Sequence, residues 1–135
     1  MGKTAFVSMT YSRKHHLKDF VDRIKVVLRD YAITPKVFVE DYNFALHEED
    51  EMMRVACDEI ASCDFLIAEL SYKAIGVGVE VGFAAGLGKP IIYMRHVDTE
   101  HSTTVSGIST HTIIYSTLDD METKLRLFIA EIGSI

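Results

Sequence analysis

The sequence contains little of what marks several classes of protein. Its 135 residues include no tryptophan, two prolines and two cysteines, Cys57 and Cys63. Both cysteines fall within one predicted helix, at a spacing that suits neither a disulfide nor a metal site, so we expect reduced thiols and no bound metal. No apolar run approaches the roughly 20 residues of a membrane span, and the N-terminal residues lack the layout of a signal peptide. The sequence therefore predicts a cytoplasmic protein that does not bind a membrane.

Basic residues are also scarce. There are 14 Lys and Arg residues against 20 Asp and Glu residues, which gives a formal net charge of −6. This balance argues against binding to a nucleic acid polymer. The charge is uneven, however, because basic residues cluster at Arg13, Lys14 and Lys18, whereas Glu48–Glu51 is acidic. A basic corner on an acidic protein suits a small anionic ligand.

Strand and helix patterns alternate along the whole chain. Apolar runs predict strands over 5–9, 36–40, 64–70, 91–95 and 111–116, and helical periodicity predicts helices over 15–31, 48–62, 77–88 and from about 117 onward. A long polar loop is expected over 96–110. The alternation predicts a single domain over 1–135, a three-layer α/β/α protein with a flavodoxin-like five-stranded parallel sheet of order 2-1-3-4-5.

A parallel sheet of this order predicts where a ligand binds. In such sheets ligands lie beyond the carboxyl ends of the strands, near the switch point between the first and third strands. The loops at that edge cover 10–16, 41–47 and 71–76, and the loop after the fourth strand adds a further wall. We therefore expect the functional residues in these loops and in the first turns of the helices that follow them.

Glu80 is the one carboxylate in the apolar, glycine-spaced segment Ser71–Pro90. We expect it in the first turn of the helix over 77–88, where apolar neighbours desolvate it and free backbone N–H groups favour its charge. An oriented, partly buried carboxylate at a ligand edge can act as a nucleophile or a base. The alternative, that Glu80 only complements the helix dipole, is equally consistent with the spacing.

Three glycines flank Glu80 in this segment. Gly76, Gly78 and Gly82 would let the backbone come close to a ligand and to the neighbouring strand. The spacing lacks the third glycine and the downstream acidic residue of a dinucleotide-binding fingerprint. These glycines therefore do not predict a dinucleotide site.

The segment "SCDFLIAELSYKAIGVGVEVGFAAGLGKPII", Ser62–Ile92, resembles the core motif of the nucleoside 2-deoxyribosyltransferase family, including its deoxynucleoside 5′-monophosphate N-glycosidase branch. The shared pattern is an aspartate, an apolar strand, a short loop, G-x-G-x-E-x-G-x-A, and then G-K-P before another strand. The resemblance implies that Glu80 is the nucleophile that attacks C1′ of the sugar and displaces the base. Water or a second base would then resolve the glycosyl-enzyme. A carboxylate suits this reaction because it stabilises and then traps an oxocarbenium-like state.

Two positions depart from the family pattern. The family usually carries Asp or Ser six residues before the nucleophile, where this chain has Ala74, and an aspartate on the preceding helix, where it has Ala56. Asp58 points away from the helix face formed by Met52, Met53, Ala56 and Ile60. Glu49 shares that face and is the better substitute for binding substrate, unless it only serves the helix dipole.

The loops that follow the first and fourth predicted strands supply further candidate binding residues. Hydroxyl groups, backbone N–H groups and a guanidinium could form a phosphate cradle, or simply a solvated basic helix start. The residues concerned are Ser8, Thr10, Tyr11, Ser12 and Arg13. In the family the corresponding loop holds the sugar and the 5′-phosphate.

Ser106 resembles a serine that the phosphate-binding branch supplies across a dimer interface. Tyr42, Asn43 and Phe44 could stack on the base, or form an apolar lid without specificity.

The leading interpretation is therefore an enzyme that cleaves an N-glycosidic bond, or transfers deoxyribose, on a nucleoside or nucleoside 5′-monophosphate. The resemblance implies a homodimer and no cofactor. One alternative is a TIR-like NAD glycohydrolase, because "FVSMTYS" (Phe6–Ser12) is similar to the first strand and loop of that domain. Another is a non-catalytic nucleotide-binding or signalling module, which Ala56 and Ala74 favour.

Overall fold

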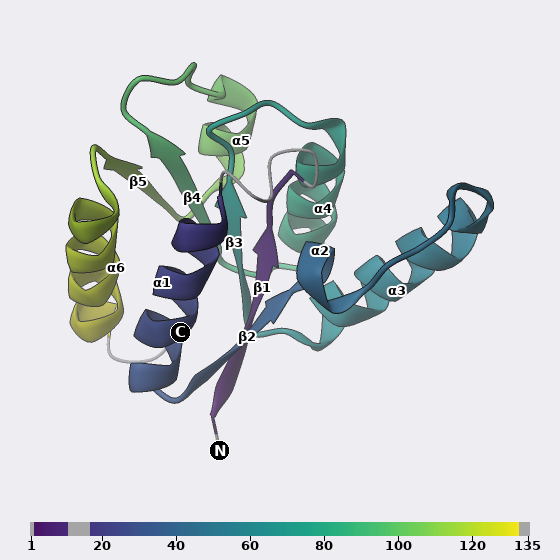
Figure 1. Ribbon diagram of the computed structural model, residues 1–135, viewed down its shortest axis with the longest axis horizontal. Coiled ribbons are helices and arrows are strands. Elements are labelled where there is room, and N and C mark those ends of the chain that lie inside the picture. The colour runs from purple at the N-terminus through teal and green to yellow at the C-terminus, as the bar shows by residue number, and fades with distance from the viewer. Residues whose placement is uncertain (1, 11–16, 133–135) are drawn as a thin grey trace.

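The computed structural model describes residues 2–10 and 17–132. Within them, five parallel strands form one sheet of order β2-β1-β3-β4-β5, which confirms the predicted topology (Figure 1). The strands are β1 (Lys3–Ser8), β2 (Ile33–Val37), β3 (Phe65–Glu69), β4 (Ile91–His96) and β5 (His111–Tyr115). The order changes direction between β1 and β3, so the carboxyl ends of these two strands mark the switch point.

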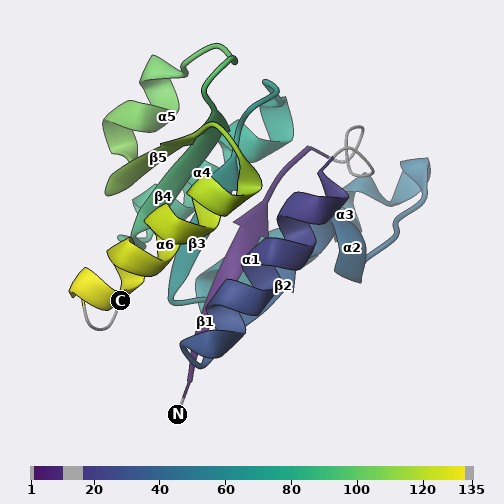
Figure 2. The same cartoon turned by 60° about the vertical axis from the view of Figure 1, so that its left-hand side comes forward.

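Helices cover both faces of the sheet. They are α1 (Lys18–Asp30), α2 (Phe38–Asp41), α3 (Glu49–Ser62), α4 (Ile75–Gly86), α5 (Thr103–Ile108) and α6 (Leu118–Ile132), and a short 3-10 turn covers Leu46–Glu48. Helices α1 and α6 lie side by side on one face, as Figure 2 shows, whereas α4 and α5 lie on the other. Helix α3 packs its C-terminal part beside α4 and extends away from the sheet (Figure 1).

Two apolar cores, one on each face of the sheet, hold these layers together. The helical periodicity of the first helix is confirmed, because α1 buries Phe20, Val21, Ile24, Val27 and Leu28 against one face. Strand β3 is buried along its whole length, as its nearly continuous apolar sequence predicts for a strand covered on both faces.

Two predicted elements were wrong. The strand expected over 36–40 lies earlier, as β2, and residues from Phe38 form α2 instead. Pro35 sits inside β2, which is possible because β2 is an edge strand and one side of its backbone needs no partner. The polar loop expected over 96–110 contains α5, whose first turn is capped by the Ser102 hydroxyl accepting from the Val105 N–H.

Helix α4 also begins earlier than expected, at Ile75. Glu80 therefore lies in the second turn rather than the first, where the backbone N–H groups already belong to the helix. The expected stabilisation of its charge by free N–H groups does not apply, and another donor must be found.

None of the helices in the described ranges is long and apolar enough to cross a membrane.

Candidate active site

The carboxyl ends of β1 and β3 bring Ser8 to Glu80. Ser8 is the last residue of β1, pairs with Ala68 of β3, and is 1% exposed. Alternation along the strand turns Ser8 to the same face as Phe6, which is the face that α4 covers. Its Oγ donates a hydrogen bond to Oε1 of Glu80 over 2.5 Å. This contact connects two residues far apart in the sequence and aims the Glu80 carboxylate.

Two opposing influences act on the pKa of Glu80. Burial raises the pKa above its ordinary value, and the hydrogen bond from Ser8 lowers it by a smaller amount. Burial dominates because it disfavours the charged form, whereas one neutral hydroxyl supports it only in part. A carboxylate with a raised pKa and one oriented oxygen is a better nucleophile than an exposed, fully solvated one.

Glu80 lines a cavity of about 460 Å³ at this edge of the sheet. Its walls come from the end of β1, from α2 and the segment after it, from α3, and from the start of α4. The described lining residues are Met9, Thr10, Phe38, Val39, Tyr42, Asn43, Phe44, Leu46, Met52, Met53, Ala74, Gly76, Val77 and Glu80. Most of these side chains are apolar, and the volume is within the usual range for a small-molecule site.

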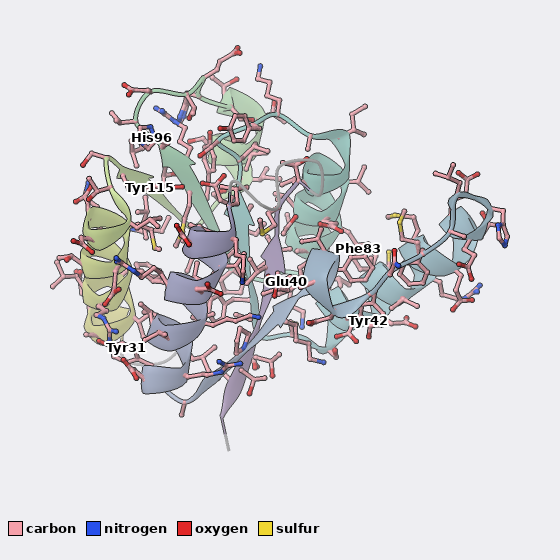
Figure 3. The ribbon with its side chains drawn as sticks, viewed as in Figure 1. Tyr31, Glu40, Tyr42, Phe83, His96 and Tyr115 are labelled. Atoms are coloured by element: carbon pink, nitrogen blue, oxygen red, sulfur yellow. The ribbon has the colours of Figure 1, made fainter. Side chains whose placement is uncertain are left out.

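An aromatic cluster forms the wall contributed by α2 and the segment after it. The rings of Phe38, Tyr42 and Phe44 lie with centroids 5.1–6.1 Å apart. Tyr42 is fixed from outside, because its hydroxyl donates to Glu59 of α3 over 2.7 Å and Lys36 pairs with the same carboxylate. Figure 3 shows Tyr42 between α2 and α3. Flat, fixed rings of this kind can stack on a planar aromatic ligand.

The structure brings together some of the predicted site residues. Thr10 and Gly76 line the Glu80 cavity, and Ser8 bonds to Glu80. Tyr42, Asn43 and Phe44 line it too, as the loop position predicted. Tyr11, Ser12 and Arg13 lie outside the described residues.

Three other predicted residues lie elsewhere in this chain. Glu49 is exposed at the start of α3 and is not among the cavity residues, whereas Met52 and Met53 of that helix are. Gly78 lines a separate hollow between α4 and α5. Ser106 lies on α5 and is not among the residues that line the Glu80 cavity.

Gly76, Gly78 and Gly82 do not pack closely against the protein, because a Cβ at any of them would meet no other described atom within 4 Å. The expectation that they bring α4 close to the neighbouring strand was therefore wrong. Gly76 faces the cavity, so its missing side chain leaves room beside Glu80.

Sequence reasoning did not identify part of the cavity wall. Met9 and Phe38 line the cavity, but Phe38 was expected within a strand and Met9 only as the end of one. The helix face carrying Met52 and Met53 was noticed, yet only for its relation to Glu49. Ala74, the first departure from the family pattern, lies in the cavity wall itself, whereas Ala56 is fully buried.

No group of three or more His, Cys, Asp or Glu side chains in the described part of the chain is arranged to hold a metal ion.

A family model for nucleoside 2-deoxyribosyltransferases matches residues 4–124. The chain belongs to the nucleoside 2-deoxyribosyltransferase family. The match covers β1 to α6 and therefore includes every wall of the Glu80 cavity. No curated protein sequence matches this chain at a significant level.

Solved structures show the same fold for this family member. A CMP N-glycosidase from Clostridium botulinum is 20% identical, with a TM-score of 0.71 over 91% of this chain and 98% of the other. A 2-deoxyribosyltransferase from Bacillus psychrosaccharolyticus is 17% identical, with a TM-score of 0.69 over 88% and 90%. A conserved protein from Enterococcus faecalis V583 is 13% identical, with a TM-score of 0.72 over 95% and 99%. At these identities the likeness concerns the fold.

Proposed function

We propose that this protein cleaves the N-glycosidic bond of a nucleoside or nucleoside 5′-monophosphate, or transfers its deoxyribose, with Glu80 as the nucleophile. The observation that carries the proposal is the Glu80 carboxylate, aimed by Ser8 and lining a cavity with an aromatic wall. Family membership supports the same reaction class.

The reaction proceeds in two displacements at one carbon. A Glu80 carboxylate oxygen attacks C1′, the electron pair of the C1′–N bond leaves with the base, and an ester joins the sugar to the enzyme. Water or a second base then attacks C1′, and the carboxylate leaves in its original form. The hydrogen bond from Ser8 holds the carboxylate in one orientation, which lowers the entropy cost of the attack.

In this proposal, different parts of the cavity bind the base and the sugar of the substrate. The planar base stacks on the wall formed by Phe38, Tyr42 and Phe44. Thr10, together with Tyr11, Ser12 and Arg13 after it, is proposed to bind the sugar and a 5′-phosphate. Glu49 is the weakest of the proposed contacts, since it is exposed and outside the cavity lining.

We further propose that the protein works as a homodimer. Helix α4 and the residue after it expose an outward row of large apolar side chains, Ile75, Val79, Phe83 and Leu87, which are 37–89% exposed (Figure 3 labels Phe83). Burying such a row is favourable, and a second copy offers the matching face. Ser106 would then reach the cavity of the other copy rather than its own.

Light scattering tests the dimer. Ile75→Asp places a charge in the apolar row but suits the first turn of a helix, so the chain should still fold. The wild type is expected at twice the mass of the chain and the variant at the mass of one chain. A monomeric wild type would refute the dimer.

A non-catalytic nucleotide-binding module is the second candidate. Ala74 favours it, because this residue of the cavity wall can make neither the ionic nor the hydrogen-bonded contact that Asp or Ser would make. In that case the cavity binds nucleotides without turnover.

One assay distinguishes these functions. The protein is incubated with ribo- and deoxynucleosides, their 5′-monophosphates and NAD, and released base is separated by chromatography. Base release that Glu80→Gln abolishes and Glu100→Gln leaves unchanged supports the proposal, since Glu100 is an exposed carboxylate. Release from NAD alone would favour an NAD glycohydrolase. Tight binding without release would favour the non-catalytic module.

A further inference from the structure

Another carboxylate, fully buried, lies at the same edge of the sheet, on its opposite face. Glu69 is the last residue of β3 and is 1% exposed. Its Oε1 accepts the backbone N–H of Ser71 over 2.7 Å. Its Oε2 accepts the Ser71 hydroxyl over 2.7 Å and the Tyr115 hydroxyl over 2.5 Å. Three donors thus converge on one carboxylate that the proposed reaction does not use.

These bonds connect the ends of three strands. Ser71 Oγ, which donates to Glu69, also accepts the backbone N–H of His96 at the end of β4 over 2.8 Å. Tyr115 ends β5, and the His96 ring meets its ring edge-on with centroids 5.8 Å apart (Figure 3). The His96 Nδ1 accepts from the Asp98 N–H over 3.1 Å, which holds the imidazole in place. Glu69 is therefore the common acceptor that joins β3 and β5 directly and β4 through Ser71.

The carboxylate sets the direction of the chain as it leaves β3. Both donor groups of Ser71 bond to it, so the chain is fixed two residues after the strand ends. Only Tyr72 and Lys73 separate Ser71 from Ala74, and α4 begins at the next residue. Ala74 and Gly76 form one edge of the Glu80 cavity. Ala74 is therefore the part of that edge nearest to the fixed Ser71, whereas Gly76 already belongs to α4.

We propose that Glu69 is a positioning residue, which fixes the Ala74 edge of the Glu80 cavity through Ser71. The effect on turnover rests on the proposed function, whereas the effect on the loop does not. Glu69 faces the layer of α1 and α6, so it contacts no substrate in the Glu80 cavity and acts through the backbone.

Glu80 itself does not depend on these bonds. It is held by Ser8 of β1, and α4 is held by the buried side chains of Val77, Val81 and Ala84. Loss of the Glu69 bonds therefore loosens the cavity edge and leaves the nucleophile in place. The expected signature is weaker substrate binding with a nearly unchanged chemical step.

The ionised form of Glu69 suits this role. Burial raises its pKa, and the hydrogen bonds from Tyr115 and Ser71 oppose that rise. Around it stand the titratable groups of His96 and Tyr115, and the nearby hollow is lined by Asp19 of α1, Tyr72 and Asp98. A glutamine keeps the shape of the side chain but offers one oxygen, so it cannot accept from two hydroxyls and a backbone N–H as the carboxylate does.

Amide hydrogen exchange on the full chain tests the positioning directly. In Glu69→Gln, the amides of Ser71 and His96 are expected to exchange at least about 10-fold faster, which corresponds to the loss of one hydrogen bond. Amides in the centre of β1 should be unchanged. The control is Glu100→Gln, which removes the exposed partner of Lys73 on the same loop. Unchanged exchange at Ser71 and His96, or equally faster exchange throughout the sheet, would overturn the proposal.

Kinetics on the same variants test the effect on the site. Glu69→Gln is expected to raise KM about 10-fold with kcat within about 3-fold of wild type, and Tyr115→Phe to raise KM less because it removes one donor of three. A fall in kcat at unchanged KM would overturn the proposal.

Two further outcomes are informative. If wild type releases no base, the proposed function fails, but the exchange experiment still decides the role of Glu69. If Glu69→Gln does not fold, Tyr115→Phe carries both measurements.

Discussion

Two glutamates, the partly buried Glu80 and the buried Glu69, occupy opposite faces of the same sheet edge and differ in how they are bonded. Glu80 accepts a hydrogen bond from one hydroxyl, that of Ser8, and lines a cavity. Glu69 accepts three hydrogen bonds, from Ser71 and Tyr115, and is almost fully enclosed. Burial raises the pKa of both carboxyl groups.

Burial alone therefore does not indicate a reactive carboxylate. Three donors spread the charge of Glu69 over a rigid network, which stabilises the backbone around it. Glu80 has less support and open space beside it, so its charge remains available to a ligand.

Replacing Glu80 is expected to have the largest effect on turnover. Glu80→Gln should lower base release at least about 1,000-fold, because the amide cannot form the glycosyl ester. Glu69→Gln should retain most of kcat. The measurement is the initial rate of base release by chromatography, and equal losses in the two variants would remove the distinction.

Removing a donor to Glu69 is expected to lower the stability of the folded protein. Tyr115→Phe should lower the free energy of unfolding by about 1–3 kcal/mol, because a buried carboxylate loses one of its donors. Urea denaturation followed by circular dichroism at pH 7 measures this. A variant as stable as wild type would show that Glu69 does not need all three bonds.

A smaller effect is expected for the donor to Glu80. Ser8→Ala should lower kcat about 10-fold, since one hydrogen bond orients the nucleophile. The Ser8 bond lowers the pKa of Glu80, so its loss should move the acid limb of the pH–rate profile to higher pH. The limb is measured from about pH 4 to pH 8, roughly the range in which carboxyl groups with raised pKa titrate. An acid limb that stays in place would mean that another group controls it.

A stability gain should accompany the loss of activity in Glu80→Gln. The pKa of Glu80 is raised above 4.5 in the folded state, so the folded state binds the proton more tightly than the unfolded chain. Wild-type stability therefore falls as pH rises from 4.5 through the raised pKa. At pH 7 the variant should be more stable than wild type, and the gain should shrink as pH falls toward 4.5. Urea denaturation across this range checks the sign, and a gain that grew on acidification would contradict it.

The smallest effect is expected from Glu100→Gln. Glu100, in the segment after β4, pairs with Lys73 on the loop between the two glutamates, but the pair is exposed and exposed pairs contribute little. Activity and unfolding midpoint should both match wild type within error. A clear loss of activity would indicate that the outer side of this loop also positions the cavity.

Much of the fold could be predicted because its signals are local. The helical stripe of α1 and the apolar run of β3 each follow from neighbouring residues. The assignment at Phe38 was wrong because Phe38 continues the apolar run of the strand before it. The helix over 103–108 was missed because it is short and rich in Ser, Thr and Gly, which are typical of loops.

The candidate site could be predicted only in part. Glu80 was recognisable as a carboxylate in an apolar run. Its expected partners, the free N–H groups of the helix start, were wrong because α4 begins earlier and Glu80 lies in the second turn. Glu69 carried no signal of its own, because one carboxylate at the end of an apolar strand is common. Its partner Tyr115 lies on a different strand.

Sequence patterns alone indicated the order of elements, the parallel sheet and Glu80 as a candidate nucleophile, because periodicity and motif spacing act between residues close in the chain. The tertiary structure alone decided which groups meet: Ser8 with Glu80 at a separation of 72 residues, and Tyr115 with Glu69 at 46. These contacts depend on strand register and on the face to which each side chain turns. Both are set by the packing of the two cores, because a shift of one residue would turn each side chain to the other face.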